Sequence, residues 1–135
     1  MYKNNIDIRG ALKIVNIPRD QLFITSKIST QEQGYDLTIK SCKRILNELG
    51  MDYLDLLLIH WPGVAGLQPV DQNNAKIRLE TYRAMEDLMS QGLVKNIGVS
   101  NFLKKHLEHL LTNVKIRPVI NQIEVHPLGW DVPTI

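Results

Sequence analysis

The chain has 135 residues, 44% of them hydrophobic and 22% charged, with 16 Lys and Arg against 14 Asp and Glu. This composition is typical of soluble globular proteins and excludes disordered, collagen-like and disulfide-scaffold chains. The longest unbroken apolar run, Leu56 to Ile59, is far shorter than the roughly 18 residues of a membrane span, so we expect no integral membrane protein. A net charge of +2 is too small to indicate a nucleic-acid-binding surface.

Cysteine content and the first residues bear on the compartment. Cys42 is the single cysteine and cannot form a disulfide within the chain. Residues 1–5 lack the apolar stretch of a signal peptide. We therefore expect a cytoplasmic protein.

Apolar residues at helical spacing alternate with short apolar runs along the first half of the chain. The spacing i, i+3, i+4 and i+7 predicts one helix over residues 8–15 and another over residues 39–49, which Gly50 ends as a left-handed cap. Residues 22–26 and 53–59 are predicted to be strands. The second of these strands is almost continuously apolar, which is typical of a strand buried on both faces in a parallel sheet.

The same alternation continues through the second half. A third helix is expected over residues 79–89 with Gly92 as its stop, and a third strand over residues 94–100. Leucines at helical spacing predict a fourth helix over residues 103–111, followed by a fourth strand over residues 118–125. Helices and strands that take turns in this way are typical of parallel α/β architecture.

Polar residues gather where the predicted strands end. They are Lys27, His60, Ser100, Asn101 and Gln122. Polar side chains at the carboxyl ends of successive strands usually line the active site of a (β/α)8 barrel. A doubly wound open sheet is the alternative, but no GxGxxG or P-loop follows the first strand. The sequence therefore favours the α/β class with a (β/α)8 TIM-barrel fold.

Four of these strand-end segments, together with the opening Tyr2-Lys3-Asn4, carry a resemblance to the aldo-keto reductases. The segments are LFITSK (22–27), LLIHWP (57–62), IGVSNF (97–102) and NQIEVHP (121–127). The resemblance runs from Tyr2 to about Pro127 and implies a (β/α)8 barrel that reduces aldehydes and ketones with a nicotinamide cofactor, normally NADPH. Such a barrel needs roughly 250 residues, so this chain holds about four strand-helix units. We expect residues 1–135 to be part of one such domain.

The resemblance implies three catalytic residues in this chain. Tyr2 is similar to the family's general acid, which donates its phenolic proton to the carbonyl oxygen as hydride arrives at carbon. An ordinary tyrosine pKa near 10 makes that transfer slow at neutral pH. Lys27 resembles the lysine whose charge lowers the tyrosine pKa, and His60 resembles the histidine that orients the substrate carbonyl. The family's catalytic aspartate would lie upstream of Met1.

The resemblance also implies a cofactor site and a substrate wall. Ser100, Asn101 and Gln122 match the residues that hold the nicotinamide carboxamide, and Trp61 is expected to line the substrate pocket. No metal is implied. The cofactor is expected to be NADP(H), although no residue here decides between NADP and NAD.

Other interpretations stay open at the level of sequence. Ser100 and Asn101 could simply cap the helix that begins near Phe102. His106 and His109 could suggest a metal or phosphate site, but a solvated helix face is the stronger interpretation.

The length of the chain leaves further alternatives. It could be a partial sequence of an intact reductase, or a non-catalytic fragment or interaction module of the same family. In either case, we expect the 135 residues by themselves to be inactive. Four strands cannot close a barrel, so we expect open sheet edges through which copies could associate. A nucleic-acid binder based on basic residues near Lys104 and Lys105 is the remote third alternative.

Overall fold

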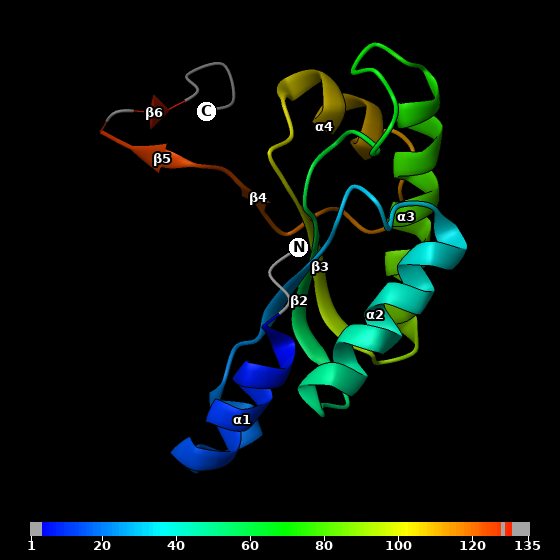
Figure 1. Cartoon of the computed structure of the whole chain (residues 1–135). Helices are drawn as coiled ribbons and strands as arrows, with labels where there is room; N and C mark the ends of the chain where they lie inside the picture. Colours follow the sequence, from blue (N-terminus) through cyan, green and yellow to red (C-terminus); the bar gives the residue numbers. More distant parts are fainter. Residues whose placement is uncertain (1–3, 128, 131–135) are drawn as a thin grey trace.

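The computed structural model describes residues 4–127 and 129–130, in which α-helices alternate with strands (Figure 1). One parallel sheet contains, in spatial order, β1 (Thr25–Ile28), β2 (Leu54–Ile59), β3 (Val94–Ser100) and β4 (Asn121–Gln122). The α-helices are α1 (Asn5–Val15), α2 (Tyr35–Leu49), α3 (Asn73–Ser90) and α4 (Lys104–Leu111), and a short 3₁₀ helix, η1, spans Arg19–Gln21. Helices α2 and α3 lie side by side along one face of the sheet. The predicted parallel α/β architecture with about four strand-helix units is confirmed.

Glycines end the two long helices where the sequence predicts. Gly50 has a φ of 67°, its N–H donates to the Asn47 carbonyl, and the Met51 N–H reaches back to Leu46 O at 3.0 Å. Gly92 has a φ of 74° and follows α3 in the same way. A residue with a side chain is strained in this left-handed conformation, so glycine suits both stops.

The core lies between the sheet and helices α2, α3 and α4. From the strands it takes mainly alternate residues of one face, together with Leu54 and Val94 at the strand starts, and from the helices it takes the apolar stripes. The fully buried members with the largest side chains include Ile28, Leu57, Ile59, Ile97, Met85, Leu88, Tyr82, Phe102 and Leu110. Every residue of β2 is buried, which confirms the predicted burial of this strand on both faces.

The opposite face of the sheet carries the residues that alternate with this core. Lys27 pairs with Leu58, and Leu58 pairs with Gly98. A Cβ atom on Gly98 would come within 2.8 Å of Leu58 Cδ2 and 2.9 Å of the Ile120 carbonyl oxygen. Glycine is therefore required where β2, β3 and the segment leading to β4 approach one another.

Two predicted strands need correction. The strand expected over residues 22–26 lies at Thr25–Ile28, because there it pairs with Leu56–Ile59 of β2. The single strand expected over residues 118–125 is wrong: β4 spans two residues, and β5 (Val125–His126) pairs antiparallel with β6 (Gly129–Trp130) in a separate hairpin. The chain leaves the sheet after Gln122 because β3 ends opposite it, at Ser100, and offers no further partner.

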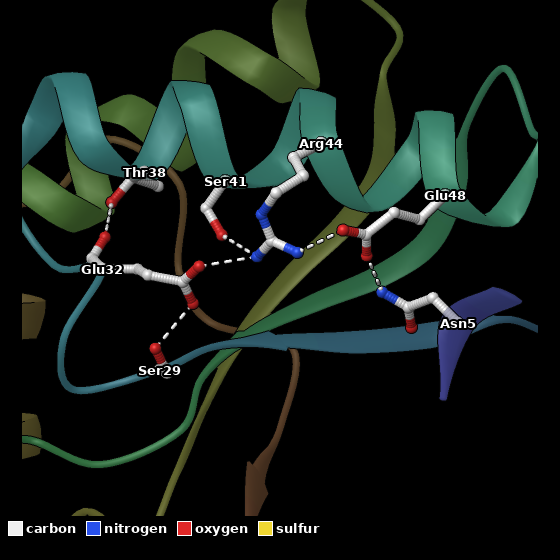
Figure 2. A network of polar contacts seen from close by, with 7 residues as sticks. All are labelled: Asn5, Ser29, Glu32, Thr38, Ser41, Arg44 and Glu48. Carbon is white, nitrogen blue, oxygen red and sulfur yellow. Dashed lines mark hydrogen bonds and ion pairs between the residues drawn. The ribbon is translucent and has the colours of Figure 1, made fainter. Parts of the chain in front are cut away.

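A polar network joins α2 to α1 and to the loop after β1 (Figure 2). Arg44 of α2 lies between two carboxylates, Glu32 at 2.6 Å and Glu48 at 2.8 Å. Glu48 accepts a 2.7 Å hydrogen bond from Asn5, and Glu32 accepts one of 2.6 Å from Ser29. These contacts hold α1 beside α2, although no residue of α1 is buried.

In the described part of the chain, no helix combines the length and the apolar character that crossing a membrane requires.

Candidate active site

Four of the predicted site residues share one face at the carboxyl end of the sheet. Lys27 lies beside Leu58 of β2, and His60 follows two residues later, so both side chains project from the face opposite the helices. Ser100 lies two residues after Gly98 on that same face and pairs with Gln122 of β4. The tertiary structure thus brings these four residues, which lie far apart in the sequence, to one edge.

Asn101 joins the ends of three strands. Its Nδ2 donates to the His60 carbonyl at 2.9 Å and to Ser100 Oγ at 3.1 Å, while its backbone N–H donates to Gln122 O at 3.0 Å. Ser100 Oγ in turn donates to the same Gln122 carbonyl at 2.7 Å. Asn101 has a φ of 60°, a left-handed conformation that asparagine tolerates better than most residues. These bonds fix the backbone on which His60, Ser100 and Gln122 stand.

The helix-cap interpretation of Ser100 and Asn101 is wrong. Helix α4 begins at Lys104, and its N-cap is Leu103, whose backbone N–H donates to His106 Nδ1 at 3.2 Å. The imidazole of His106 also meets the Phe102 ring edge-on, with centroids 5.9 Å apart. The solvated face expected for His106 is therefore wrong too, because this side chain is half-buried against its own helix start.

Burial lowers the pKa of His60 below its usual value of 6.5, and the positive charge of Lys27 lowers it further. The imidazole is consequently neutral at neutral pH and can donate one N–H to an acceptor such as a carbonyl oxygen. Lys27 is half-buried and makes no ion pair with a carboxylate among residues 4–127. A positive charge and a neutral donor therefore lie side by side at this edge.

Trp61 follows His60 and is 50% exposed. Its ring centroid lies 6.2 Å from that of His60, with the two planes tilted by 43°. An indole exposed beside a polar edge can form an apolar wall for a bound molecule, so the substrate-pocket role of Trp61 stays a prediction.

Tyr2 lies outside the described residues, so its proposed role stays a prediction.

One positioning residue was missed by the sequence reasoning. Asn121 donates from Nδ2 to the Phe102 carbonyl at 2.8 Å, and its Oδ1 accepts the Phe102 N–H at 3.2 Å. This pair of bonds clamps the segment after Asn101 to β4. In the sequence, Asn121 is visible only as an amide residue beside Gln122 at a predicted strand end. Amides are common at such positions, and no neighbouring residue indicates that Asn121 binds Phe102.

The sequence profile of the Aldo/keto reductase family matches residues 1–134. The chain belongs to the aldo-keto reductase family. A glyoxal reductase of Bacillus subtilis is 42% identical over 127 residues, covering 94% of this chain and 42% of the relative. Aldose reductase B of Dictyostelium discoideum is 41% identical over 145 aligned positions, covering 94% of this chain and 47% of the relative. The chain thus spans less than half the length of these curated relatives.

Solved aldo-keto reductases agree in fold. The enzyme from Brucella melitensis superposes with a TM-score of 0.83 at 40% identity, covering 93% of this chain and 46% of that one. An aldo-keto reductase of Bombyx mori in complex with NADP gives a TM-score of 0.85 at 35% identity, covering 98% of this chain and 44% of that one. The four parallel strands therefore correspond to part of the TIM barrel of these aldo-keto reductases.

Proposed function

We propose that this chain supplies the carbonyl-binding and nicotinamide-binding part of a reductase that converts aldehydes and ketones to alcohols with NADPH. The observation that carries the proposal is the shared edge of Lys27, His60, Ser100 and Gln122, held together by Asn101. Similarity to reductases named for glyoxal and aldose supports a carbonyl substrate.

The proposed catalytic residues divide the proton chemistry among themselves. Tyr2 donates its phenolic proton to the carbonyl oxygen. The charge of Lys27 beside the phenol favours tyrosinate and so lowers the barrier to that transfer. His60, neutral at the reaction pH, donates a hydrogen bond to the same oxygen and orients it.

The donor set at the edge suits a nicotinamide carboxamide. The Nδ2 of Asn101 donates hydrogen bonds within the protein, to the His60 carbonyl and to Ser100 Oγ. Its Oδ1 and the side-chain amide of Gln122 make no hydrogen bond to any described residue. These groups supply the donor and acceptors that a carboxamide needs to hold one ring face toward the substrate. The cofactor, when bound, supplies the hydride. Complexes of silkworm relatives with NADP and NADPH support NADP(H) over NAD(H).

We also propose that residues 1–135 form part of one aldo-keto reductase domain. We further propose that the protein is cytoplasmic. The open edge of β1 makes a second copy of the chain a further partner, because its outer backbone groups have no strand beside them within the described residues. Sedimentation velocity at rising concentration tests this: a constant monomer would contradict association.

The test of the proposed function is a titration of the purified chain with NADPH. Trp61 and Trp130 are the two tryptophans, so a Trp130→Phe background leaves Trp61 as the only reporter. We expect saturable quenching by NADPH, whereas turnover of an added aldehyde, followed at 340 nm, is not expected of these 135 residues alone. The absence of any saturable change would contradict the proposal for this chain and favour the non-catalytic fragment.

Two tyrosine variants separate chemistry from binding. In an intact reductase that contains this chain, Tyr2→Phe is expected to remove most turnover and leave the NADPH titration unchanged, because it deletes only the proton donor. Tyr35→Phe is the matched control, since Tyr35 is exposed on α2 and, among the described residues, its hydroxyl bonds only to Asp87. Undiminished turnover in Tyr2→Phe would refute the role of Tyr2.

A further inference from the structure

The segment between β2 and α3 that begins at Trp61 is held in an unusual way. Three successive backbone carbonyls, those of Trp61, Pro62 and Gly63, each accept a hydrogen bond from a buried side chain. Gln33 Nε2 donates to Trp61 O and Gly63 O, both at 2.8 Å, and Arg78 Nη1 donates to Pro62 O at 2.8 Å. We call residues 61–68 the Trp61 loop.

The rest of the Trp61 loop is also tied to elements on either side. Asn74 of α3 accepts the Val64 N–H at 2.9 Å and donates to Gln68 O at 2.8 Å. The Ala65 N–H donates to Thr30 O at 2.9 Å. An irregular loop with this many backbone groups bonded to buried side chains has little freedom to move.

Burial shows that these are interior contacts. Gln33 is 4% exposed and Asn74 and Arg78 are each 5% exposed, whereas Trp61 itself is half exposed. Arg78 makes no ion pair with any carboxylate in the described chain. A buried guanidinium without a counter-charge is costly, so its one strong hydrogen bond, to Pro62, is the contact that its position serves.

Arg78 also reaches the neighbouring strand end. Its guanidinium carbon lies 5.8 Å from the centre of the Phe102 ring, and Phe102 directly follows Asn101. The same side chain therefore contacts the segment after β2, which carries Trp61, and the segment after β3, which carries Asn101.

We propose that Gln33 and Arg78 are positioning residues that fix Trp61 as a rigid wall beside His60 before any substrate binds. The functional meaning of this wall rests on the proposed reductase function, but its rigidity can be measured without it. Trp61 then has the same position before and after substrate binds. The Trp61 loop is therefore a preformed wall and not a lid that closes over the substrate.

The experiment uses the full chain with Trp130→Phe, and it measures acrylamide quenching of Trp61 together with amide hydrogen exchange of residues 61–68. Arg78→Met and Gln33→Leu keep the side-chain bulk but remove the donors. We expect each variant to increase exchange at Val64 and Ala65 by about tenfold, the effect of losing one such bond from a local opening equilibrium, and to expose Trp61 to quencher. Arg78→Lys should restore the parent values, because the guanidinium uses a single donor toward Pro62.

The matched control is Glu86→Ala on the same helix. Glu86 is also buried, and its Oε1 accepts the N–H groups of Lys115 and Ile116, so it holds a different loop. Its loss should lower the melting temperature without changing Trp61 quenching or exchange of the Trp61 loop. Equal effects of Glu86→Ala and Arg78→Met on Trp61 would overturn the proposal, since they would reflect general destabilisation.

The outcomes also separate this proposal from the function on which it rests. If Arg78→Met does not fold, Gln33→Leu carries the test, and unchanged exchange in a folded Gln33→Leu variant overturns the proposal. If the loop responds as expected while the parent chain binds no NADPH, the positioning role stands and the reductase function of this chain fails. Where the parent turns over aldehyde, Arg78→Met should raise KM for the aldehyde and leave the Kd for NADPH unchanged.

Discussion

The two ends of the sheet use charge in opposite ways. At the amino ends of β2 and β3, Asp55 is buried and contacts Arg19 at 2.8 Å and Lys95 at 3.5 Å. Each of the same two cations also lies 4.0 Å from the centre of the Tyr53 ring. At the carboxyl ends, Lys27 has no carboxylate partner in the described structure and stands beside a neutral His60.

The charges at the amino ends of the strands are paired with one another and stabilise the fold, whereas Lys27 at the carboxyl ends has no carboxylate partner among the described residues. Burial by itself would raise the pKa of Asp55, but the Ile24 N–H, the Arg19 guanidinium and the Lys95 ammonium together hold that pKa below its ordinary value of 3.8. Asp55 is thus ionised at neutral pH, where it binds the Ile24 N–H, Arg19 and Lys95. At the carboxyl end, Lys27 has no carboxylate partner among the described residues, and functional side chains usually lie at this end of the strands in this barrel architecture.

The largest expected effect comes from breaking the amino end. Asp55→Ala should lower the free energy of unfolding by about 3 kcal/mol, because it leaves the Ile24 N–H and the Arg19 guanidinium without their acceptor. Urea unfolding measures the change. The control is Asp52→Ala, an exposed position nearby, where we expect a change within about 0.5 kcal/mol. A similar loss in both variants would contradict the special role of Asp55.

Asp55 also predicts a pH dependence. Because its pKa is lower in the folded state, its stabilisation is complete above the ordinary value of 3.8 and is lost as the pH falls through the folded pKa. Unfolding measured below pH 3.8 should show a steeper loss of stability in the parent chain than in Asp55→Ala.

The second expected effect tests the close approach of strands below the carboxyl end. Gly98→Ala should destabilise the fold by about 2 kcal/mol, because the added methyl group meets Leu58 and the Ile120 carbonyl. Gly10→Ala is the matched control in helix α1, where nothing lies within 4 Å of the added Cβ, and it should stabilise by about 0.5 kcal/mol. Thermal unfolding of the two variants should shift in opposite directions, and a neutral Gly98→Ala would refute the packing argument.

The third effect sharpens the comparison at the carboxyl end itself. Ser100→Ala removes the hydrogen bond to Gln122 O and one partner of Asn101, so we expect a loss of about 1 kcal/mol. We further expect weaker NADPH binding in the fluorescence titration. Ser90→Ala, at an exposed position on α3, should change neither quantity. Unaltered NADPH affinity in a folded Ser100→Ala variant would place the cofactor elsewhere.

The smallest effect concerns His106, near the carboxyl end but outside the shared edge. Burial, together with the smaller effects of the charges of Arg78 and Lys105, lowers its pKa to about 4. Since protonation removes the acceptor for the Leu103 N–H, stability should fall as the pH drops from 6.5 toward about 4, the interval in which the unfolded chain binds the proton first. His60, whose pKa is also lowered in the folded chain, should likewise reduce stability as the pH falls.

His106→Asn isolates the contribution of this side chain. The Asn Oδ1 can accept the same N–H without titrating, so the variant should lose stability less steeply over that interval. Parallel curves for the parent and the variant would contradict the assignment to His106.

Much of the fold was predictable because its signals are local. The apolar spacing located α2 and α3, Gly50 and Gly92 marked their ends, and β3 was predicted at its observed bounds. The apolar spacing of a helix and the glycine that ends it involve only residues that are neighbours in the sequence. Both can therefore be recognised from the sequence alone. The residues at the strand ends were predictable for the same reason, with the resemblance naming their roles.

The tertiary structure decided where strands begin and end and which polar groups meet. Strand β1 lies three residues later than predicted at its start, and β4 is shortened, because pairing stops where the neighbouring strand has no group to offer. The contacts of Arg19 with Asp55, Asn101 with His60, and Arg78 with Pro62 join residues 36, 41 and 16 positions apart. Such contacts leave no periodic trace in the sequence, since their partners become neighbours only once the sheet and its helices have packed.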